Sequence, residues 1–202
     1  MREEVIRLAS AGADYMHMDV MDGAFVPNFG LGSEVFNIVR ENTTVPMDVH
    51  LMIRNPARHI EFFRRLGAEI ICVHPESCQE PRKTLAQIRD TGAKAGIALN
   101  PETPVEFIAP LIPLCDHILA MTVNPGFAGQ DYLESTNPKL AQLGELSARH
   151  GFTLCVDGNI NPQRVRDLLP LGVTNFVIGS ALFRNDPAAM IREIKGGSVC
   201  SA

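Results

Sequence analysis

Short apolar runs recur along the chain, and amphipathic stretches that end in glycine precede most of them. The runs are rich in Ile, Val and Leu and apolar on both faces, which is typical of parallel strands buried on both sides of a sheet. Glycine is the expected residue just after a helix because it adopts the left-handed conformation at low cost. The pattern predicts strands at residues 15–19, 47–52, 70–74, 95–100, 117–123, 152–157 and 175–179.

Amphipathic segments between these runs predict helices at residues 3–11, 34–40, 56–66, 81–90, 138–150 and 162–169. Proline lies at or near the start of four of them, as suits a first helical turn. Strand and helix alternate without a Gly/Ser linker, which indicates an α/β fold, either an open doubly wound sheet or a closed barrel. The barrel is favoured. Because eight strands close the usual barrel and the chain begins inside a helix, we expect a TIM (β/α)8 barrel that lacks its first strand.

Length and composition fit one ordinary globular domain. The 202 residues are predicted to form a single barrel domain over 1–195, followed by a frayed tail over 196–202. No apolar run approaches the roughly 18 residues needed to cross a bilayer, and the first residues do not resemble a secretory signal. We therefore expect a cytoplasmic protein with no membrane partner. A net charge of -5 provides no positive field for nucleic acid, so local groups must hold any anionic ligand.

Polar residues collect where the predicted strands end. The carboxyl ends of parallel strands form the ligand-binding face of such folds. His17 and Asp19 are two positions apart and share one strand face, as do Asp48 and His50. Asp48, one pleat below His50, is a candidate for supporting the site from behind. The strand endings are His17 and Asp19, His50, His74, Asn100, Asn124 and Asp157.

In a barrel, two histidines and two aspartates from these strand ends would converge. Two imidazoles and two carboxylates are a suitable ligand set for one divalent ion such as Zn²⁺, Fe²⁺, Mn²⁺ or Co²⁺. The sequence therefore predicts a divalent metal as cofactor.

Other histidines and the cysteines are expected to have structural roles. His59 and His150 lie on helical patterns and His117 opens a strand, so all three are predicted at the surface or at the bottom face of the barrel. The five cysteines are odd in number, widely spaced and never in a Cys-x-x-Cys pair. This pattern suggests neither a disulfide framework nor a thiolate zinc site, and free thiols are expected.

Glycine-containing loops follow the last three strands, at residues 124–130, 157–160 and 179–180. Loops of this kind direct backbone N–H groups at a phosphate, and the final loops of a barrel are its usual phosphate-binding place. None of them is a P-loop, since no Gly-Lys-Ser/Thr sequence occurs. Three such loops at successive strand ends favour a phosphate-bearing ligand.

Taken together, these segments resemble the ribulose-phosphate 3-epimerase family. The resemblance extends from about residue 14 to residue 183, and its motifs are long and in the family's order. The matching segments are residues 17–23, 25–28, 48–52, 73–76, 100–104, 122–130, 156–158 and 179–180.

The resemblance implies a TIM-barrel isomerase that moves a proton at C3 of a ketose phosphate. By it, the enzyme would interconvert D-ribulose 5-phosphate and D-xylulose 5-phosphate in the pentose phosphate pathway. His17, Asp19, His50 and Asp157 would be the metal ligands, and Asp19 and Asp157 would also be the catalytic acid–base pair. A small-molecule sugar phosphate would be the partner, and assembly into a homo-oligomer stays open.

The resemblance also assigns binding residues. Met21, Met52 and Met121 match methionines that line the family's site, and ordinary core filling is an equal alternative for them. Substrate and phosphate contacts would come from His50, Gly126, Phe127, Ala128, Gly129, Gly158, Asn159, Gly179 and Ser180.

The sequence departs from the family at several points. The family's opening strand, with its Ser-Pro-Ser motif, has no counterpart, and Ala24 replaces a common histidine. Asn159 replaces a common glycine; because asparagine tolerates positive φ, its N–H can still face a phosphate. Glu102 and Thr122 look more like the branch that acts on D-allulose 6-phosphate, so a D-allulose-6-phosphate 3-epimerase remains an alternative.

Two further alternatives stay open. One is a different phosphate-binding barrel enzyme, such as a decarboxylase or an aldolase, because the glycine loops suit any phosphate ligand. No lysine ends a predicted strand, which argues against Schiff-base chemistry. The other is a truncated, inactive barrel that only binds a sugar phosphate.

Overall fold

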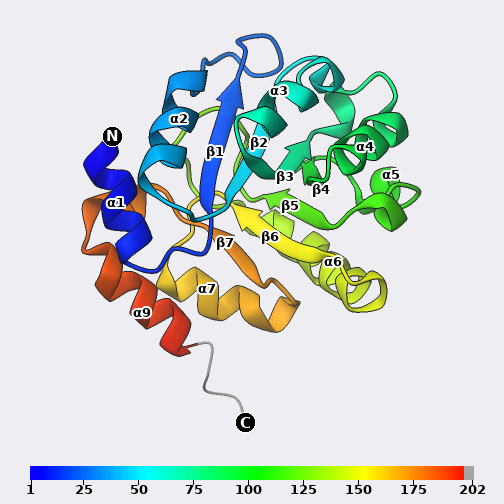
Figure 1. The fold of residues 1–202 in the computed structure, drawn as a ribbon. Coiled ribbons are helices and arrows are strands. Elements are labelled where there is room, and N and C mark those ends of the chain that lie inside the picture. The colour runs from blue at the N-terminus through cyan, green and yellow to red at the C-terminus, as the bar shows by residue number, and fades with distance from the viewer. Residues whose placement is uncertain (198–202) are drawn as a thin grey trace.

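A computed structural model describes residues 1–197, in which seven parallel strands form one sheet in sequence order. The sheet curls, with its helices on the outer side (Figure 1). The strands are β1 (Met16–Met21), β2 (Met47–Met52), β3 (Ala68–Val73), β4 (Lys94–Leu99), β5 (His117–Met121), β6 (Thr153–Asp157) and β7 (Asn175–Val177).

The helices connect successive strands. The longest, α6, follows β5, and α1 lies beside α9 near the edge of the sheet that β1 forms (Figure 1). The helices are α1 (Arg2–Ser10), α2 (Ser33–Asn42), α3 (Ile60–Arg65), α4 (Pro81–Asp90), α5 (Val105–Ile108), α6 (Asn137–His150), α7 (Pro162–Leu168), α8 (Ser180–Arg184) and α9 (Pro187–Gly197). None of the helices within residues 1–197 combines the length and the apolar character that crossing a membrane requires.

The predicted strands and most predicted helices are confirmed, and the glycine pattern explains why. All five glycines expected just after helices have a positive φ: Gly12, Gly67, Gly92, Gly151 and Gly172. In contrast, the helix predicted over residues 56–66 divides into a 3-10 turn, η1 (Pro56–Arg58), and α3. The pattern did not predict α5, α8 or α9, and α5 and α8 are too short to show a helical period.

The two edge strands, β1 and β7, are not paired with each other in the described part of the chain. This agrees with the expectation of a barrel that lacks one strand. The predicted frayed tail is partly helical, since α9 continues through Gly197; the rest of that segment lies outside the described residues.

Two apolar layers pack against the sheet. The larger lies between the strands and the outer helices and includes Phe36, Ile60 and Leu85. The smaller lies on the inner face of the curled sheet. Its members are Ile70, Cys72, Ala98, Leu119, Met121, Val123 and Cys155. Because side chains alternate between the two faces of a strand, the same strands supply both layers and also point polar residues into the interior.

The contact between α6 and the turn η5 (Leu169–Leu171) leaves no room for a side chain at Gly144. A Cβ there would lie 1.9 Å from the carbonyl oxygen of Leu171. Alanine normally favours a helix over glycine by about 1 kcal/mol, but here we expect Gly144→Ala to destabilise the protein by about 1–3 kcal/mol, because the helix must move outward. Thermal unfolding should show a lower midpoint.

Gly196→Ala in α9 is the matched control, because no atom of the described residues lies within 4 Å of a Cβ at that position. It should leave the melting temperature unchanged or raise it slightly. Equal effects of the two substitutions would contradict the steric explanation.

Candidate active site

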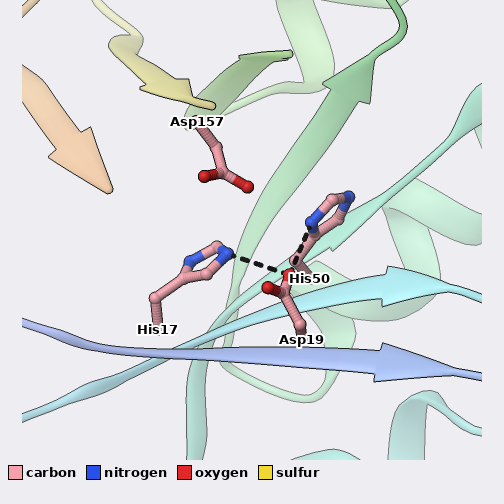
Figure 2. Close-up of side chains that lie close together, drawn as sticks. All are labelled: His17, Asp19, His50 and Asp157. Carbon is pink, nitrogen blue, oxygen red and sulfur yellow. Dashed lines mark hydrogen bonds and ion pairs between the residues drawn. The ribbon is translucent and has the colours of Figure 1, made fainter. Parts of the chain in front are cut away.

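Four polar side chains from three strands meet on the inner face of the curled sheet, and of these only Asp157 is the last residue of its strand. His17 and Asp19 come from β1, His50 from β2 and Asp157 from the end of β6 (Figure 2). One donor atom of each lies within 4.8 Å of the others. The convergence predicted for two histidines and two aspartates is therefore present.

The contacts within this cluster centre on Asp19. Its Oδ1 lies 3.1 Å from His50 Nδ1 and 3.3 Å from His17 Nε2 (Figure 2). The second contact lacks hydrogen-bond geometry, so His17 Nε2 is a buried nitrogen without a hydrogen-bond partner among the described residues. A buried polar atom left unpaired is costly. An orphaned imidazole nitrogen facing two carboxylates and a second imidazole fits a divalent cation.

The surroundings separate the pKa values of the two carboxyl groups. Burial raises the pKa of Asp157 to about 6, where the nearby His17 opposes the shift and Asp19 adds to it. Burial also acts on Asp19, but its close contacts and charge interactions with His17 and His50 outweigh it and hold its pKa well below the usual range. Two carboxyl groups with diverging pKa values are suited to act as an acid and a base.

A buried residue holds each imidazole of the cluster, one from β2 and one from the position just after β3. Asp48 Oδ2 lies 2.9 Å from His17 Nδ1, and His74 Nε2 lies 2.8 Å from His50 Nε2. Both supporting side chains are at most 1% exposed. These contacts leave Nε2 of His17 and Nδ1 of His50 facing the cluster, where they are available to a cation. The supporting position predicted for Asp48 agrees with this geometry.

Asp48→Asn is expected to weaken divalent-metal affinity by about 10- to 100-fold, the usual effect of losing an outer partner of a ligating histidine. The amide is uncharged, and it can present a donor where His17 needs an acceptor. Calorimetric titration of the metal-free protein with Zn²⁺ or Co²⁺ measures the change. Asp116→Asn is the control, because Asp116 accepts a hydrogen bond from Ala95 N at the far end of the strands. Equal metal affinity of the Asp48 variant and the wild type would contradict the prediction.

A cavity of about 290 Å³ opens directly above the four-residue cluster. Asp19 and Asp157 form part of its wall, and Met21, Met52 and Met121 line it as well. The three methionines are thus placed as the family resemblance implied. The glycine loops complete the wall, with Gly126, Phe127, Ala128, Gly129, Gly158, Asn159, Gly179 and Ser180 among the lining residues.

The loop geometry suits an anion held by backbone groups. Gly126, Gly129, Gly158 and Asn159 all have positive φ, so the conformation expected for Asn159 is confirmed. A Cβ at Gly158 would approach Thr122 Oγ1 to 2.8 Å. Among the described lining residues none is lysine or arginine. An anion in this cavity would therefore rely on backbone N–H groups and uncharged side-chain donors such as Ser180, in keeping with the net negative charge of the chain.

Three polar side chains brace these loops, and the sequence analysis did not include two of them, Asn28 and Gln130, among the site residues. Asn28 Nδ2 donates to Gly126 O at 2.6 Å, Gln130 Nε2 donates to Asn124 O at 2.6 Å, and Asn159 Nδ2 donates to Gln130 O at 3.0 Å. Asn28 and Gln130 fall inside the motifs that matched the family. Their position in those motifs was the available signal, but a loop-bracing role needs the folded contacts.

The three remaining histidines follow their prediction in part. His150 is exposed on α6, as expected; His59 is exposed too, but it lies in the turn between η1 and α3 and not on a helix. His117 is not at the surface, because it is only 1% exposed and lies inside the barrel at the start of β5. Its position at a strand start suggested the end of the barrel, but the inward face of that strand buries it. The four cysteines within the described residues are free thiols, as expected.

Comparison with known proteins identifies the family. The sequence model described as the ribulose-phosphate 3 epimerase family matches residues 1–183. The chain belongs to the ribulose-phosphate 3-epimerase family. It is 43% identical over 185 residues to a ribulose-phosphate 3-epimerase of Synechocystis, covering 90% of this chain and 80% of that protein. A Bacillus subtilis ribulose-phosphate 3-epimerase is 40% identical over 197 residues, covering 96% and 91%.

Solved structures identify the fold of this family member as a TIM barrel. A Pyrococcus furiosus tryptophan synthase alpha-subunit superposes with a TM-score of 0.72 at 14% identity, covering 96% of this chain and 91% of that one. A 3-hexulose-6-phosphate synthase gives a TM-score of 0.67 at 15% identity, covering 97% and 94%. At these identities the likeness concerns the fold alone. The sequence left two folds, an open doubly wound sheet and a barrel that lacks one strand. The barrel is confirmed.

Proposed function

We propose that the protein is a ribulose-phosphate 3-epimerase, which interconverts D-ribulose 5-phosphate and D-xylulose 5-phosphate. The observation that carries the proposal is the pair Asp19 and Asp157, which share one cavity wall above the imidazoles and differ in pKa. The names of the relatives supply the substrate. Their similarity extends over most of both chains, which supports the same reaction here.

Epimerisation at C3 requires a base on one face of the carbon and an acid on the other. A single fixed base would return the proton to the face it left, so two groups are needed. Asp19 and Asp157 come from strands on different sides of the barrel and can flank the substrate carbon. Asp19, whose low pKa keeps it ionised, would remove the C3 proton, and Asp157, whose pKa of about 6 lets it carry a proton near neutral pH, would donate to the opposite face. The reverse reaction exchanges the two roles.

His17, Asp19, His50 and Asp157 would hold the divalent cation, which the orphaned His17 nitrogen and the donor set fit. Zn²⁺, Fe²⁺, Mn²⁺ and Co²⁺ all suit these ligands. A cation bound there supplies Lewis-acid stabilisation of the negative charge that develops on the substrate oxygens when C3 loses its proton. Each 1.36 kcal/mol of such stabilisation corresponds to about tenfold in rate.

The glycine loops position the substrate by its phosphate. Backbone N–H groups around Gly126–Gly129, Gly158–Asn159 and Gly179–Ser180 would bind the phosphate at one side of the cavity. Holding the phosphate fixes the distance of C3 from both carboxyl groups, which turns proton transfer into an intramolecular step. The methionines provide an apolar wall that limits the access of water to C3.

Isotope exchange tests this function. The metal-loaded protein is incubated with D-ribulose 5-phosphate in D₂O, and deuterium at C3 is followed by NMR together with the formation of xylulose 5-phosphate. D-allulose 6-phosphate is compared under the same conditions. Preferred turnover of the pentulose supports the proposal, and preferred turnover of the hexulose would assign the protein to the D-allulose-6-phosphate branch. Absence of C3 exchange with both compounds and with each of the four metals would refute an epimerase.

A further inference from the structure

A second cluster of potential metal ligands lies deeper in the barrel, toward the amino-terminal ends of the strands. It consists of Asp48 on β2, Cys72 on β3 and His117 on β5. One carboxylate oxygen, the thiol sulfur and one imidazole nitrogen lie within 4.8 Å of one another. All three side chains are at most 1% exposed. The proposed epimerase reaction uses neither Cys72 nor His117.

The backbone makes room for this cluster at Gly96. In the strand register, Cys72 pairs with Gly96, and Gly96 pairs with His117, so the three residues form one row across β3, β4 and β5. A Cβ at Gly96 would lie 2.3 Å from Cys72 Sγ. Because Gly96 has no side chain, the thiol of Cys72 can occupy the space above β4, between Cys72 and His117.

The polar atoms of the cluster are poorly satisfied by one another. His117 Nε2 is buried and has no hydrogen-bond partner among the described residues. Cys72 Sγ is 3.8 Å from Asp48 Oδ1, a long contact for a weak donor. Buried polar groups normally find partners, so an unpaired imidazole nitrogen beside a carboxylate and a thiol calls for a further ligand.

We propose that Asp48, Cys72 and His117 form a second transition-metal site, suited to Zn²⁺ and to ions of similar preference. Thiolate, imidazole and carboxylate are the three ligand types that Zn²⁺ takes, and three protein ligands leave one position for water. In a tetrahedral site with bond lengths of about 2.3 Å to sulfur and about 2.0 Å to oxygen, the two ligand atoms lie about 3.5 Å apart. The 3.8 Å between Cys72 Sγ and Asp48 Oδ1 needs little adjustment to reach that value.

Binding requires the thiol proton of Cys72 to leave. A coordinated thiol is deprotonated outright, and the released proton passes to the buffer. The edge strands β1 and β7 do not pair within the described residues. Tyr15 and Val177, which pack against the inner apolar layer, are only partly buried.

The carboxylate of Asp48, a member of the lower cluster, also contacts the upper cluster of His17, Asp19, His50 and Asp157. Its Oδ2 contacts His17 of the upper cluster, while its Oδ1 faces Cys72. A cation bound by Asp48, Cys72 and His117 would partly neutralise the Asp48 carboxylate, which also contacts His17. Occupancy of the lower site is therefore expected to weaken the support of the upper one. The lower site is distinguishable from the upper one by chemistry, since only the lower site contains sulfur.

Titration of the metal-free full chain with Co²⁺ tests the proposal. We expect a second equivalent of Co²⁺ to bind and to produce the near-ultraviolet charge-transfer band of a thiolate–Co²⁺ bond. Cys72→Ser should abolish the band while the first equivalent still binds. Cys155→Ser is the matched control and should keep the band, because Cys155 is the other buried thiol of the inner layer and lies outside the cluster.

A single bound equivalent without the band would overturn the proposal, as would a band that persists in Cys72→Ser. If Cys72→Ser fails to fold, Gly96→Ala provides the same test without removing a ligand. Its methyl group displaces the thiol, and we expect affinity for the second equivalent to fall by about 10- to 100-fold. Unchanged second-site affinity in Gly96→Ala would also refute the site. These measurements do not depend on epimerase activity. The second metal site can therefore be refuted while the proposed epimerase function stands, and the reverse also holds.

Discussion

An Asp157→Asn variant is expected to lose about 10²- to 10⁴-fold in kcat, the range that a positioned general acid or base contributes. Asparagine matches the size of aspartate but cannot exchange a proton in this way. Asp157 lies at the end of β6 in the cavity wall, and burial raises its pKa to about 6, so it can both donate and accept a proton near neutral pH. Steady-state rates with D-ribulose 5-phosphate measure the loss.

The exchange pattern of this variant tests the two-base arrangement more sharply than the rate. Asp19 remains in this variant. The epimer whose C3 proton faces Asp19 should therefore still exchange that proton with solvent, while the other epimer should not. Asp90→Asn is the control, because Asp90 is an exposed carboxylate at the end of α4. Equal exchange of both epimers in Asp157→Asn would contradict a division of labour between the two carboxyl groups.

The order of strands and helices could be predicted because local signals repeat. Each glycine at a helix end marks a backbone that other residues adopt at a cost, and these positions have positive φ in the structure. The division of residues 56–66 at His59 could not be predicted in this way. Its amphipathic pattern continues without a break, whereas the backbone at His59 departs from helical geometry.

The positions of His17, Asp19, His50 and Asp157 could be predicted from strand ends, because parallel strands of a curled sheet bring these ends together. The residues behind them were harder to identify. All six residues of β2 are buried, so burial does not distinguish its two faces, and only the two-residue spacing of Asp48 and His50 indicated that both share one face. The burial of His117 was missed for the same reason, since every residue of β5 is buried.

Contacts between loops far apart in the sequence also could not be predicted from the pattern of residues. Asn28 and Gly126 are 98 residues apart and meet only because β1 and β5 open into the same cavity. Their hydrogen bond ties the loop after β1 to the glycine loop. The family motifs placed both residues near the site, but only the folded chain shows that one supports the other.

Removal of divalent metal is expected to abolish activity and to lower the melting temperature, and addition of Zn²⁺, Fe²⁺, Mn²⁺ or Co²⁺ should restore both. A ligand that binds only the folded state stabilises it by about 4 kcal/mol when its free concentration is roughly 1,000 times Kd. Without a cation, His17 Nε2 has no hydrogen-bond partner in the part of the chain that the structure describes, and the carboxyl groups of Asp19 and Asp157 face each other within one cluster. Chelation followed by metal analysis, kinetics and thermal unfolding measures these effects.

An Asp19→Asn variant tests whether the metal-dependent rise in melting temperature arises at the four-residue cluster. Asp19 lies at the centre of the cluster, in contact with both imidazoles, so its loss should remove most of the metal-dependent rise in melting temperature. Asp90→Asn should keep the full rise. Full activity of a wild-type preparation shown by elemental analysis to lack metal would contradict metal dependence. Without a cation, only the Asp19–Asp157 pair would face the negative charge that develops on the substrate oxygens. Two carboxyl groups cannot offset that charge, which is why we expect activity to require the metal.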